Sequence, residues 1–254
     1  MVRNGTFDWY DIMSRDVDVT TRFYTQLFGW TCKAVDMGPM GTYPMLHNGE
    51  QAFGGITRLR EGEATSHWLG YLSTTDLDAA VGRTRQHGGL IRVPPTPIPG
   101  VGRFSVITDP GGAVVSLFQG NDPPTGPTAR HTEVGDVGWA ELMSAELPRA
   151  RAFYTEVVGW DVSASIDMGE VGLYVLVKVG EEGVGGMVAK PPTLPASNWS
   201  FYVNVESADA VVEKAKSLGA TVLVGPEDVP DMVRFALLTD PTGALFGVAQ
   251  PLRK

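Results

Sequence analysis

The chain has 254 residues, of which 43% are hydrophobic and 19% are charged, and its net charge is −9 from 20 basic and 29 acidic side chains. This balance is typical of a globular protein, and without a basic cluster it argues against binding nucleic acid. The sequence holds no run of 18 apolar residues and no apolar signal-peptide core; we therefore expect a cytoplasmic protein with no membrane segment. The single cysteine, Cys32, excludes an internal disulfide.

The first half opens with a predicted strand over 7–13 and a helix from Val17 to Phe28. Two strands follow near 42–47 and 52–58. The second of these contains the pair Gly54 and Gly55, and we expect it to mark a bulge or a close backbone approach.

The rest of the first half repeats this order of elements, and we interpret the repeated unit as βαβββ, present four times in the chain. A strand at 68–74 leads to a helix at 77–87, which Gly88 and Gly89 end. The strands predicted after this helix lie near 90–93, 103–108 and 113–119. We expect the proline-rich stretch 94–102 to be a loop, because prolines cannot donate the hydrogen bonds of a central strand.

The second half repeats the first at an offset of 130 residues, which later becomes 131. FYTQLFGW (23–30) corresponds to FYTEVVGW (153–160), and RFSVITDPGGAVVSLFQ (103–119) corresponds to RFALLTDPTGALFGVAQ (234–250). A repeat of this length indicates duplication of a whole domain. Since 120–136 is rich in proline, glycine and polar residues, we predict a first domain at 1–122, a linker at 123–134 and a second domain at 135–254.

The paired βαβββ order, the FYxxxxGW motif and the DPxGxxxxxxQ motif resemble the vicinal oxygen chelate superfamily of glyoxalases, bleomycin-resistance proteins and extradiol dioxygenases. More closely, the chain looks like the two-domain actinobacterial members often labelled hydroxylases or glyoxalase-like antigens. The resemblance implies an α+β fold of four βαβββ modules, paired into two tandem cup-shaped glyoxalase-like domains. It also implies a small-molecule site in each cup.

The resemblance implies that, in metal-dependent members, side chains of His, Glu or Gln hold a divalent ion at four places in each cup. The first-strand place falls on Trp9 and Trp139, and an indole cannot coordinate a metal ion. The remaining places fall near Gly70, Phe201, Ser116 and Gly247, or in fourth strands that carry no suitable donor. We therefore predict no bound metal and no cofactor.

Strand alternation sends Trp9, Asp11 and Met13 to one face, and Trp139, Glu141 and Met143 to the equivalent face of the second half. An aromatic wall beside one acid suits a planar ligand. The other candidate ligand-binding residues come from inward positions or from the starts of strands: Tyr43, Trp68, Ser116, Phe118, Tyr174, Trp199 and Phe201.

Two roles remain open for the acids. A carboxylate against an aromatic wall loses water, which raises its pKa and suits Asp11 or Glu141 to act as a catalytic acid or base. Alternatively, Arg103 and Arg234 neutralise these acids in buried ion pairs that fix the sheet.

These observations predict a metal-independent small-molecule-binding protein of the glyoxalase and bleomycin-resistance type, which holds a planar or aromatic, natural-product-like ligand. The alternative is an enzyme: a lyase, isomerase or cyclase, or a glyoxalase-like enzyme with an atypical metal site, that uses Asp11 or Glu141 for proton transfer. The expected partner is a small molecule, and the chain is expected to be a monomer or a homodimer.

Overall fold

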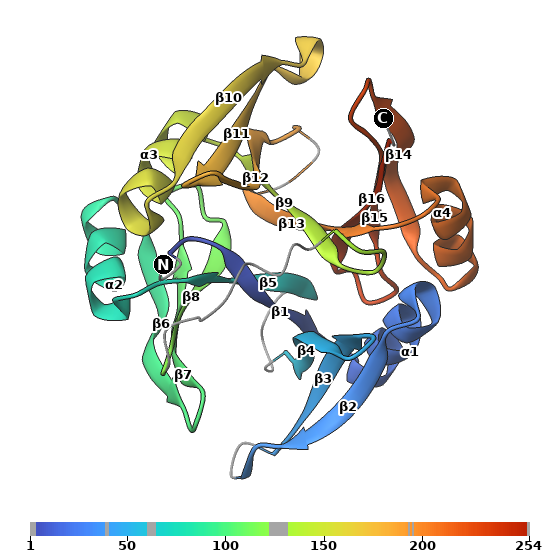
Figure 1. Cartoon of the computed structure of the whole chain (residues 1–254), viewed down its shortest axis with the longest axis horizontal. Helices are drawn as coiled ribbons and strands as arrows, with labels where there is room; N and C mark the ends of the chain where they lie inside the picture. The colour runs from blue at the N-terminus through green and yellow to red at the C-terminus, as the bar shows by residue number, and fades with distance from the viewer. Residues whose placement is uncertain are drawn as a thin grey trace. The chain divides into compact units, whose positions relative to one another are not determined.

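The computed structural model describes residues 4–38, 41–59, 65–121, 132–192, 194 and 196–252 (Figure 1). The elements of the first half are β1 (Phe7–Ser14), α1 (Val17–Phe28), β2 (Thr31–Asp36), β3 (Thr42–Asn48), β4 (Gln51–Arg58), β5 (His67–Ser73), α2 (Leu77–Gln86), β6 (Leu90–Ile98), β7 (Gly102–Thr108) and β8 (Val114–Gly120). The elements of the second half are β9 (Val137–Ser144), α3 (Leu147–Val158), β10 (Asp161–Asp167), the 3-10 helix η2 (Gly169–Val171), β11 (Leu173–Val179), β12 (Glu182–Ala189), β13 (Asn198–Asn204), α4 (Ala208–Ser217), β14 (Thr221–Val229), β15 (Val233–Thr239) and β16 (Leu245–Pro251).

The strands form two sheets of eight strands each. One sheet has the order β2-β3-β4-β1-β5-β8-β7-β6, and the other has the matching order β10-β11-β12-β9-β13-β16-β15-β14. Within the described residues neither sheet is a closed barrel, and each half contributes two βαβββ modules. The predicted α+β fold of four modules is confirmed.

Two predictions about individual strands were wrong. The strand β2 (Thr31–Asp36) was not predicted, because most of its side chains are exposed and they show no alternation. The stretch 94–98, which was expected to be a loop, belongs to β6. This strand lies at the end of its sheet, beside β7, and its register shifts between Val93 and Thr96. Pro94 and Pro95 are tolerated there, because an end strand and a register shift do not need every backbone N–H.

Contacts along the chain divide it into two compact units, and each unit takes segments from both halves of the sequence. Unit 1 consists of the described residues of Met1–Trp9, Leu69–Thr128 and Trp139–Trp199, and unit 2 consists of those of Tyr10–Trp68, Ala129–Gly138 and Ser200–Lys254. The predicted linker 123–134 lies mostly outside the described residues, so the predicted domain limits stay a prediction.

In unit 2 the helix of the first half packs on the last strands of the second half. The ring of Tyr24 on α1 lies 5.5 Å from that of Phe246 on β16, and the indole of Trp68 donates a hydrogen bond of 2.9 Å to the Tyr24 hydroxyl. The carboxylate of Asp240, in the DPxG turn before β16, is also buried near this hydroxyl and raises its pKa further above the value that burial sets. FYxxxxGW and DPxG therefore meet across the two halves of the sequence.

Unit 1 contains the reciprocal arrangement. The indole of Trp199 donates 2.9 Å to the hydroxyl of Tyr154 on α3, and burial followed by the charge of Asp109 raises the pKa of that phenol. The final tryptophan of each motif also bonds backbone from the other half: Trp160 donates 2.7 Å to the Gly5 carbonyl in unit 1, and Trp30 donates 2.8 Å to the Gly135 carbonyl in unit 2. The FYxxxxGW motif therefore packs each helix against residues of the other half.

Among the described residues, no helix is long and apolar enough to cross a membrane.

Candidate ligand-binding site

The two faces of β1 have different surroundings. Ser14 and Ile12 are fully buried, and the Ser14 hydroxyl bonds that of Thr20 on α1 at 2.6 Å, so this set of alternate residues faces the helix. The other set contains Trp9, Asp11 and Met13, of which Trp9 and Met13 are half-buried. Alternation along the strand therefore places the three candidate residues on the side away from α1.

In unit 2 the structure brings Tyr43 to Asp11. The Tyr43 hydroxyl on β3 donates a hydrogen bond to the Asp11 carboxylate on β1. Between them runs β4, where Gly55 is paired with both Asp11 and Met45. The Tyr43 ring lies directly over Gly55, where any Cβ would collide with it. The missing side chain is what allows the phenol to cross one strand and reach the acid.

Unit 1 contains the equivalent pair, with the indole added. Trp139 on β9 donates a hydrogen bond of 2.9 Å to the Tyr174 hydroxyl, and that hydroxyl donates 2.8 Å to Oε2 of Glu141. Here Gly186 is paired with Glu141, and a Cβ on it would collide with the Tyr174 ring. Because an indole only donates and a phenol has one proton, the direction of this chain is fixed from Trp139 through Tyr174 to the Glu141 carboxylate.

The electrostatics keep Tyr174 a hydrogen-bond donor. Burial raises the pKa of its phenol well above the usual value, the negative charge of Glu141 raises it further, and the N–H of Trp139 opposes both effects. The phenol therefore stays protonated at neutral pH and cannot act as a phenolate base.

The glycine pairs Gly54–Gly55 and Gly185–Gly186 mark a close approach of the backbone, and a bulge lies directly before each pair. The β3–β4 register shifts between Leu46 and His47, and the β11–β12 register shifts between Val177 and Lys178. The first glycine of each pair, Gly54 or Gly185, faces a carbonyl of the neighbouring strand, where a Cβ would clash.

Three predicted ligand-binding residues are core residues instead. Trp68 and Trp199 are 3% and 2% exposed and bond tyrosines of α1 and α3. Phe201 is fully buried, and its ring lies 5.1 Å from that of Tyr10 and 6.2 Å from that of Trp68. The prediction was wrong because alternation separates two faces of a strand but does not say which face meets the helices.

The remaining predicted positions differ in exposure. Phe118 is half-buried and paired with Phe104, whereas Ser116 is fully buried and its hydroxyl is 3.4 Å from the Ser105 carbonyl oxygen. Met143 is 4% exposed, less than its counterpart Met13.

Two tyrosines, Tyr71 and Tyr202, were not among the candidate residues chosen from the sequence. Tyr71 is paired with Ser116 in unit 1, and its ring lies 6.3 Å from that of Phe104. Tyr202 in unit 2 lies over Gly247 and 6.4 Å from the ring of Phe235. Had Trp68 and Trp199 been assigned to the helix face, the alternation in HWLGYLS and NWSFYVN would have placed both tyrosines on the other face.

The arginine interpretation was wrong. Arg103 forms a two-pronged salt bridge with Asp78 of α2, at 3.0 Å for each contact. Arg234 pairs with Asp209 of α4 at 2.7 Å and with Asp228 at 3.0 Å. The pairs with Asp78 and Asp209 tie a strand to the first turn of a helix, and the pair with Asp228 joins β15 to β14. Within the described parts of the chain, neither arginine bonds Asp11 or Glu141.

The residues present do not fit the metal centre that the fold implies. Trp9 and Trp139 occupy the first-strand ligand place, and neither indole can coordinate a cation. The buried Nδ1 of His47 has no hydrogen-bond partner in the described structure, yet no group of three or more His, Cys, Asp or Glu side chains suited to a metal ion lies there or elsewhere in the described residues.

The fold and its motifs define the class of protein. The sequence model of the Glyoxalase/Bleomycin resistance protein/Dioxygenase superfamily matches residues 6–117 and again 136–248. The chain belongs to this superfamily, and the resemblance seen in the sequence is confirmed.

Individual relatives cover nearly the whole chain. The Mycobacterium tuberculosis protein CFP32, whose name assigns it provisionally to the glyoxylases, is 36% identical over 98% of this chain and 96% of its own length. The anthracycline biosynthesis protein DnrV of Streptomyces peucetius is 31% identical over 97% of this chain and 93% of its own length.

Solved structures show the same fold at low sequence identity. The Mn(II)-bound glyoxalase of Novosphingobium aromaticivorans is 16% identical with a TM-score of 0.68, and the match covers 100% of this chain and 84% of that one. The 2,3-dioxygenase LapB of Pseudomonas sp. KL28 is 12% identical with a TM-score of 0.67, over 100% and 94% of the two chains.

Proposed function

We propose that this protein binds a planar, aromatic small molecule without a metal ion, beside the carboxylate–tyrosine pair of each half. Its superfamily fold is that of a small-molecule-binding protein. The chain of hydrogen bonds from Trp139 through Tyr174 to Glu141 carries the proposal, because it puts a flat apolar surface and ordered polar groups in one place.

The absence of a fitting ligand set supports the metal-independent part of the proposal. At the place where a metal would need a donor, this chain has an indole, and the neighbouring Glu141 carboxylate accepts a hydrogen bond from a phenol. Relatives named for anthracycline biosynthesis support the ligand class, since an anthracycline contains a planar fused-ring system.

Binding of a planar probe tests the proposal. We would titrate a dihydroxyanthraquinone into the protein and compare it with a saturated tricyclic alcohol of similar size, following both by calorimetry. The aromatic probe is expected to bind, and Trp139→Ala or Trp9→Ala is expected to weaken binding about tenfold at the affected site. Leu90→Ala, at a residue 57% exposed on β6, is the control and should change nothing.

Either of two results would contradict the proposal. One is equal binding by the parent and both tryptophan variants. The other is a stoichiometric metal in the purified protein whose removal by a chelator abolishes binding of the probe.

The carboxylate–phenol hydrogen bonds also favour a second candidate, an enzyme that uses Asp11 or Glu141 as a proton acceptor. The amide variants Asp11→Asn and Glu141→Gln separate the two functions once a ligand is known. A binding protein keeps most of its affinity in these variants, whereas an acid–base enzyme keeps its affinity and loses about a hundredfold or more in turnover.

A further inference from the structure

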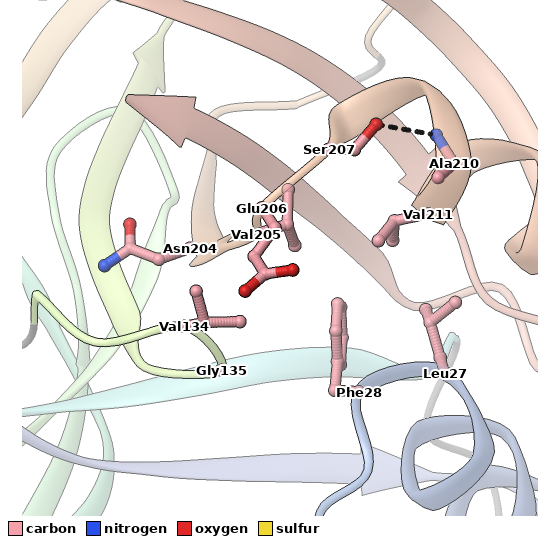
Figure 2. Close-up of a pocket in the computed structure, with 10 residues that line it drawn as sticks. All are labelled: Leu27, Phe28, Val134, Gly135, Asn204, Val205, Glu206, Ser207, Ala210 and Val211. Carbon is pink, nitrogen blue, oxygen red and sulfur yellow. Dashed lines mark hydrogen bonds between the residues drawn. The ribbon is translucent and has the colours of Figure 1, made fainter. Parts of the chain in front are cut away.

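A pocket in unit 2 shares no lining residue with either carboxylate–tyrosine pair. Its volume is about 220 Å³, and it lies between the end of α1, the start of α4 and the segment at 134–135 (Figure 2). The residues that line it are Leu27, Phe28, Val134, Gly135, Asn204, Val205, Glu206, Ser207, Ala210 and Val211. This volume is below the range of about 300–1,000 Å³ that drug-sized ligands occupy, so a smaller molecule fits.

The duplicated sequence supplies an internal comparison, because the same place in unit 1 is closed. There the side chain of Asn4 donates 2.9 Å to the Val158 carbonyl at the end of α3, and its amide oxygen accepts from the Thr75 N–H at 3.3 Å. The Asn4 carboxamide thus satisfies both the Val158 carbonyl at the helix end and the Thr75 N–H of the loop.

In unit 2 the residues that close this place are changed. Val134 stands where Asn4 stands, and Glu206 stands where Thr75 stands. Valine cannot bridge the two backbone groups, and no hydrogen bond to the Phe28 carbonyl, the counterpart of the Val158 carbonyl, is found within the described residues. The open pocket therefore retains an acceptor that its copy satisfies internally.

The groups around the pocket favour a cation. Glu206 is exposed, and its carboxylate lies between Val134 and Phe28 without a hydrogen bond or ion pair to any described residue (Figure 2). The Phe28 carbonyl is at the negative end of the α1 dipole, and the Phe28 ring adds an aromatic surface. The basic side chain of Lys214 already donates 3.2 Å to the Leu27 carbonyl, as that of Arg83 does at 3.0 Å to the Val157 carbonyl in unit 1.

We propose that this pocket binds a small organic cation with N–H donors and an apolar body, of the aryl amidinium class. The charged end pairs with Glu206 and donates to the Phe28 carbonyl, which takes the place of the Asn4 amide in unit 1. The apolar body lies against Phe28, Val134 and Val211. This site does not depend on the function proposed for the carboxylate–tyrosine pairs.

Three probes of nearly identical shape test the charge preference. Benzamidine is cationic, benzamide is neutral and benzoate is anionic, and ligand-observed NMR titration gives their relative affinities for the whole chain. Benzamidine is expected to bind at least about fivefold more tightly than either of the others. Equal or tighter binding of benzamide or benzoate, or no benzamidine binding at millimolar concentration, would overturn the proposal.

Two variants locate the site. Glu206→Gln is expected to remove the advantage of benzamidine over benzamide. The double change Val134→Asn with Glu206→Thr copies the closed arrangement of unit 1 and is expected to abolish binding. Since Glu206 and Val134 are exposed, thermal unfolding should show both variants folded. Unchanged benzamidine affinity in both variants would place the probe elsewhere and reject the pocket.

Crossed controls separate this site from the carboxylate–tyrosine pairs. Trp139→Ala is expected to keep benzamidine binding, and Glu206→Gln is expected to keep anthraquinone binding. The reciprocal change in unit 1, Asn4→Val with Thr75→Glu, is expected to add a second benzamidine site. Loss of benzamidine binding in Trp139→Ala would show that the probe had bound beside Glu141 and would reject the proposed pocket.

Discussion

At the residue scale, a glycine decides whether each acid meets its tyrosine. Gly186 lies between Glu141 on β9 and Tyr174 on β11, and the phenol crosses directly over its backbone. The same geometry recurs at Gly55 in unit 2. The site therefore depends on an absent side chain as much as on those that are present.

Replacement of this glycine should displace the phenol. Gly186→Ala puts a methyl group into the Tyr174 ring, and we expect it to lower the free energy of unfolding by about 1–3 kcal/mol. Urea unfolding measures the loss. Gly183→Ala in the same strand is the matched control: an added Cβ there meets nothing within 4 Å, so its stability should be unchanged or slightly raised. Equal effects of the two changes would show that the overlap with Tyr174 is unimportant.

Much of the site's chemistry could be predicted at this scale, but not its arrangement. The repeated tryptophan and acid of β1 and β9 were visible as WYDIM and WAELM, and both tyrosines were candidates. That each phenol bonds its acid depends on the β3–β4 and β11–β12 registers, which a strand pattern does not specify. The same limit put Trp68 and Trp199 on the wrong face, since only their bonds to Tyr24 and Tyr154 show which side meets a helix.

At the element scale, the DPxG turn is built around a buried acid. Oδ1 of Asp240 accepts hydrogen bonds from the backbone of Thr242 at 2.8 Å and Ala244 at 3.0 Å, while Oδ2 is buried without a hydrogen bond to the described residues. Burial raises the pKa of this carboxyl above its ordinary value of 3.8, against the lowering effect of these bonds. The turn therefore holds a carboxylate that is costly to ionise.

This turn should make stability depend on pH. Because its folded pKa is raised, the native chain keeps the Asp240 proton where the unfolded chain has lost it. The stability from this group is full below the unfolded pKa and falls as the pH rises through the folded pKa. Asp240→Asn keeps the acceptor and removes the charge, so we expect a smaller fall in the free energy of unfolding as the pH rises above about 4.

Chemical unfolding at several pH values measures this effect, with Asp161→Asn as control because Asp161 is exposed on β10. Asp240→Ala should be less stable than the parent at every pH, because the turn loses its acceptor. A profile for Asp240→Asn that runs parallel to that of the parent would show that the charge has no effect.

The helices and most strands were predictable because their signals are local. Asp16 accepts hydrogen bonds from the backbone of Asp18 and Val19 and begins α1, and Gly29 ends it in the left-handed conformation. The strand β2 lacks any such signal, since it lies at the end of its sheet and is mostly exposed. Its pairing with β3 across six residue pairs, and not its own sequence, holds it in place.

At the scale of the whole molecule, the repeat predicts two similar halves but not their exchange of partners. The offset of 130 residues can be seen in the sequence. The contact of Tyr24 with Phe246 cannot, because these residues are far apart in the sequence. Each compact unit combines one helix from the first half with one from the second. A duplicated sequence does not predict this exchange, because a helix of one half can pack on the strands of its own half or on those of the other half.

Dividing the chain in two tests this exchange. We expect fragments cut within 123–134 to copurify when they are expressed together and to unfold cooperatively, because both units need segments from each fragment. Size-exclusion chromatography and thermal unfolding measure this. Each fragment expressed alone should expose Tyr24 or Tyr154 and should aggregate or pair with another copy. Two fragments that behave as stable, independent monomers would contradict the expectation.

The hydrogen bond of Trp30 to Gly135 and the ring contact of Tyr24 with Phe246 form only after the second half of the chain has been made. When the ribosome has made α1, the strands that cover it are still more than 200 residues away, since β16 begins at Leu245 and α1 ends at Phe28. The side of this helix that meets Phe246 therefore stays uncovered until translation is nearly complete. Transiently exposed apolar surface of this kind is prone to aggregation, which chaperones prevent.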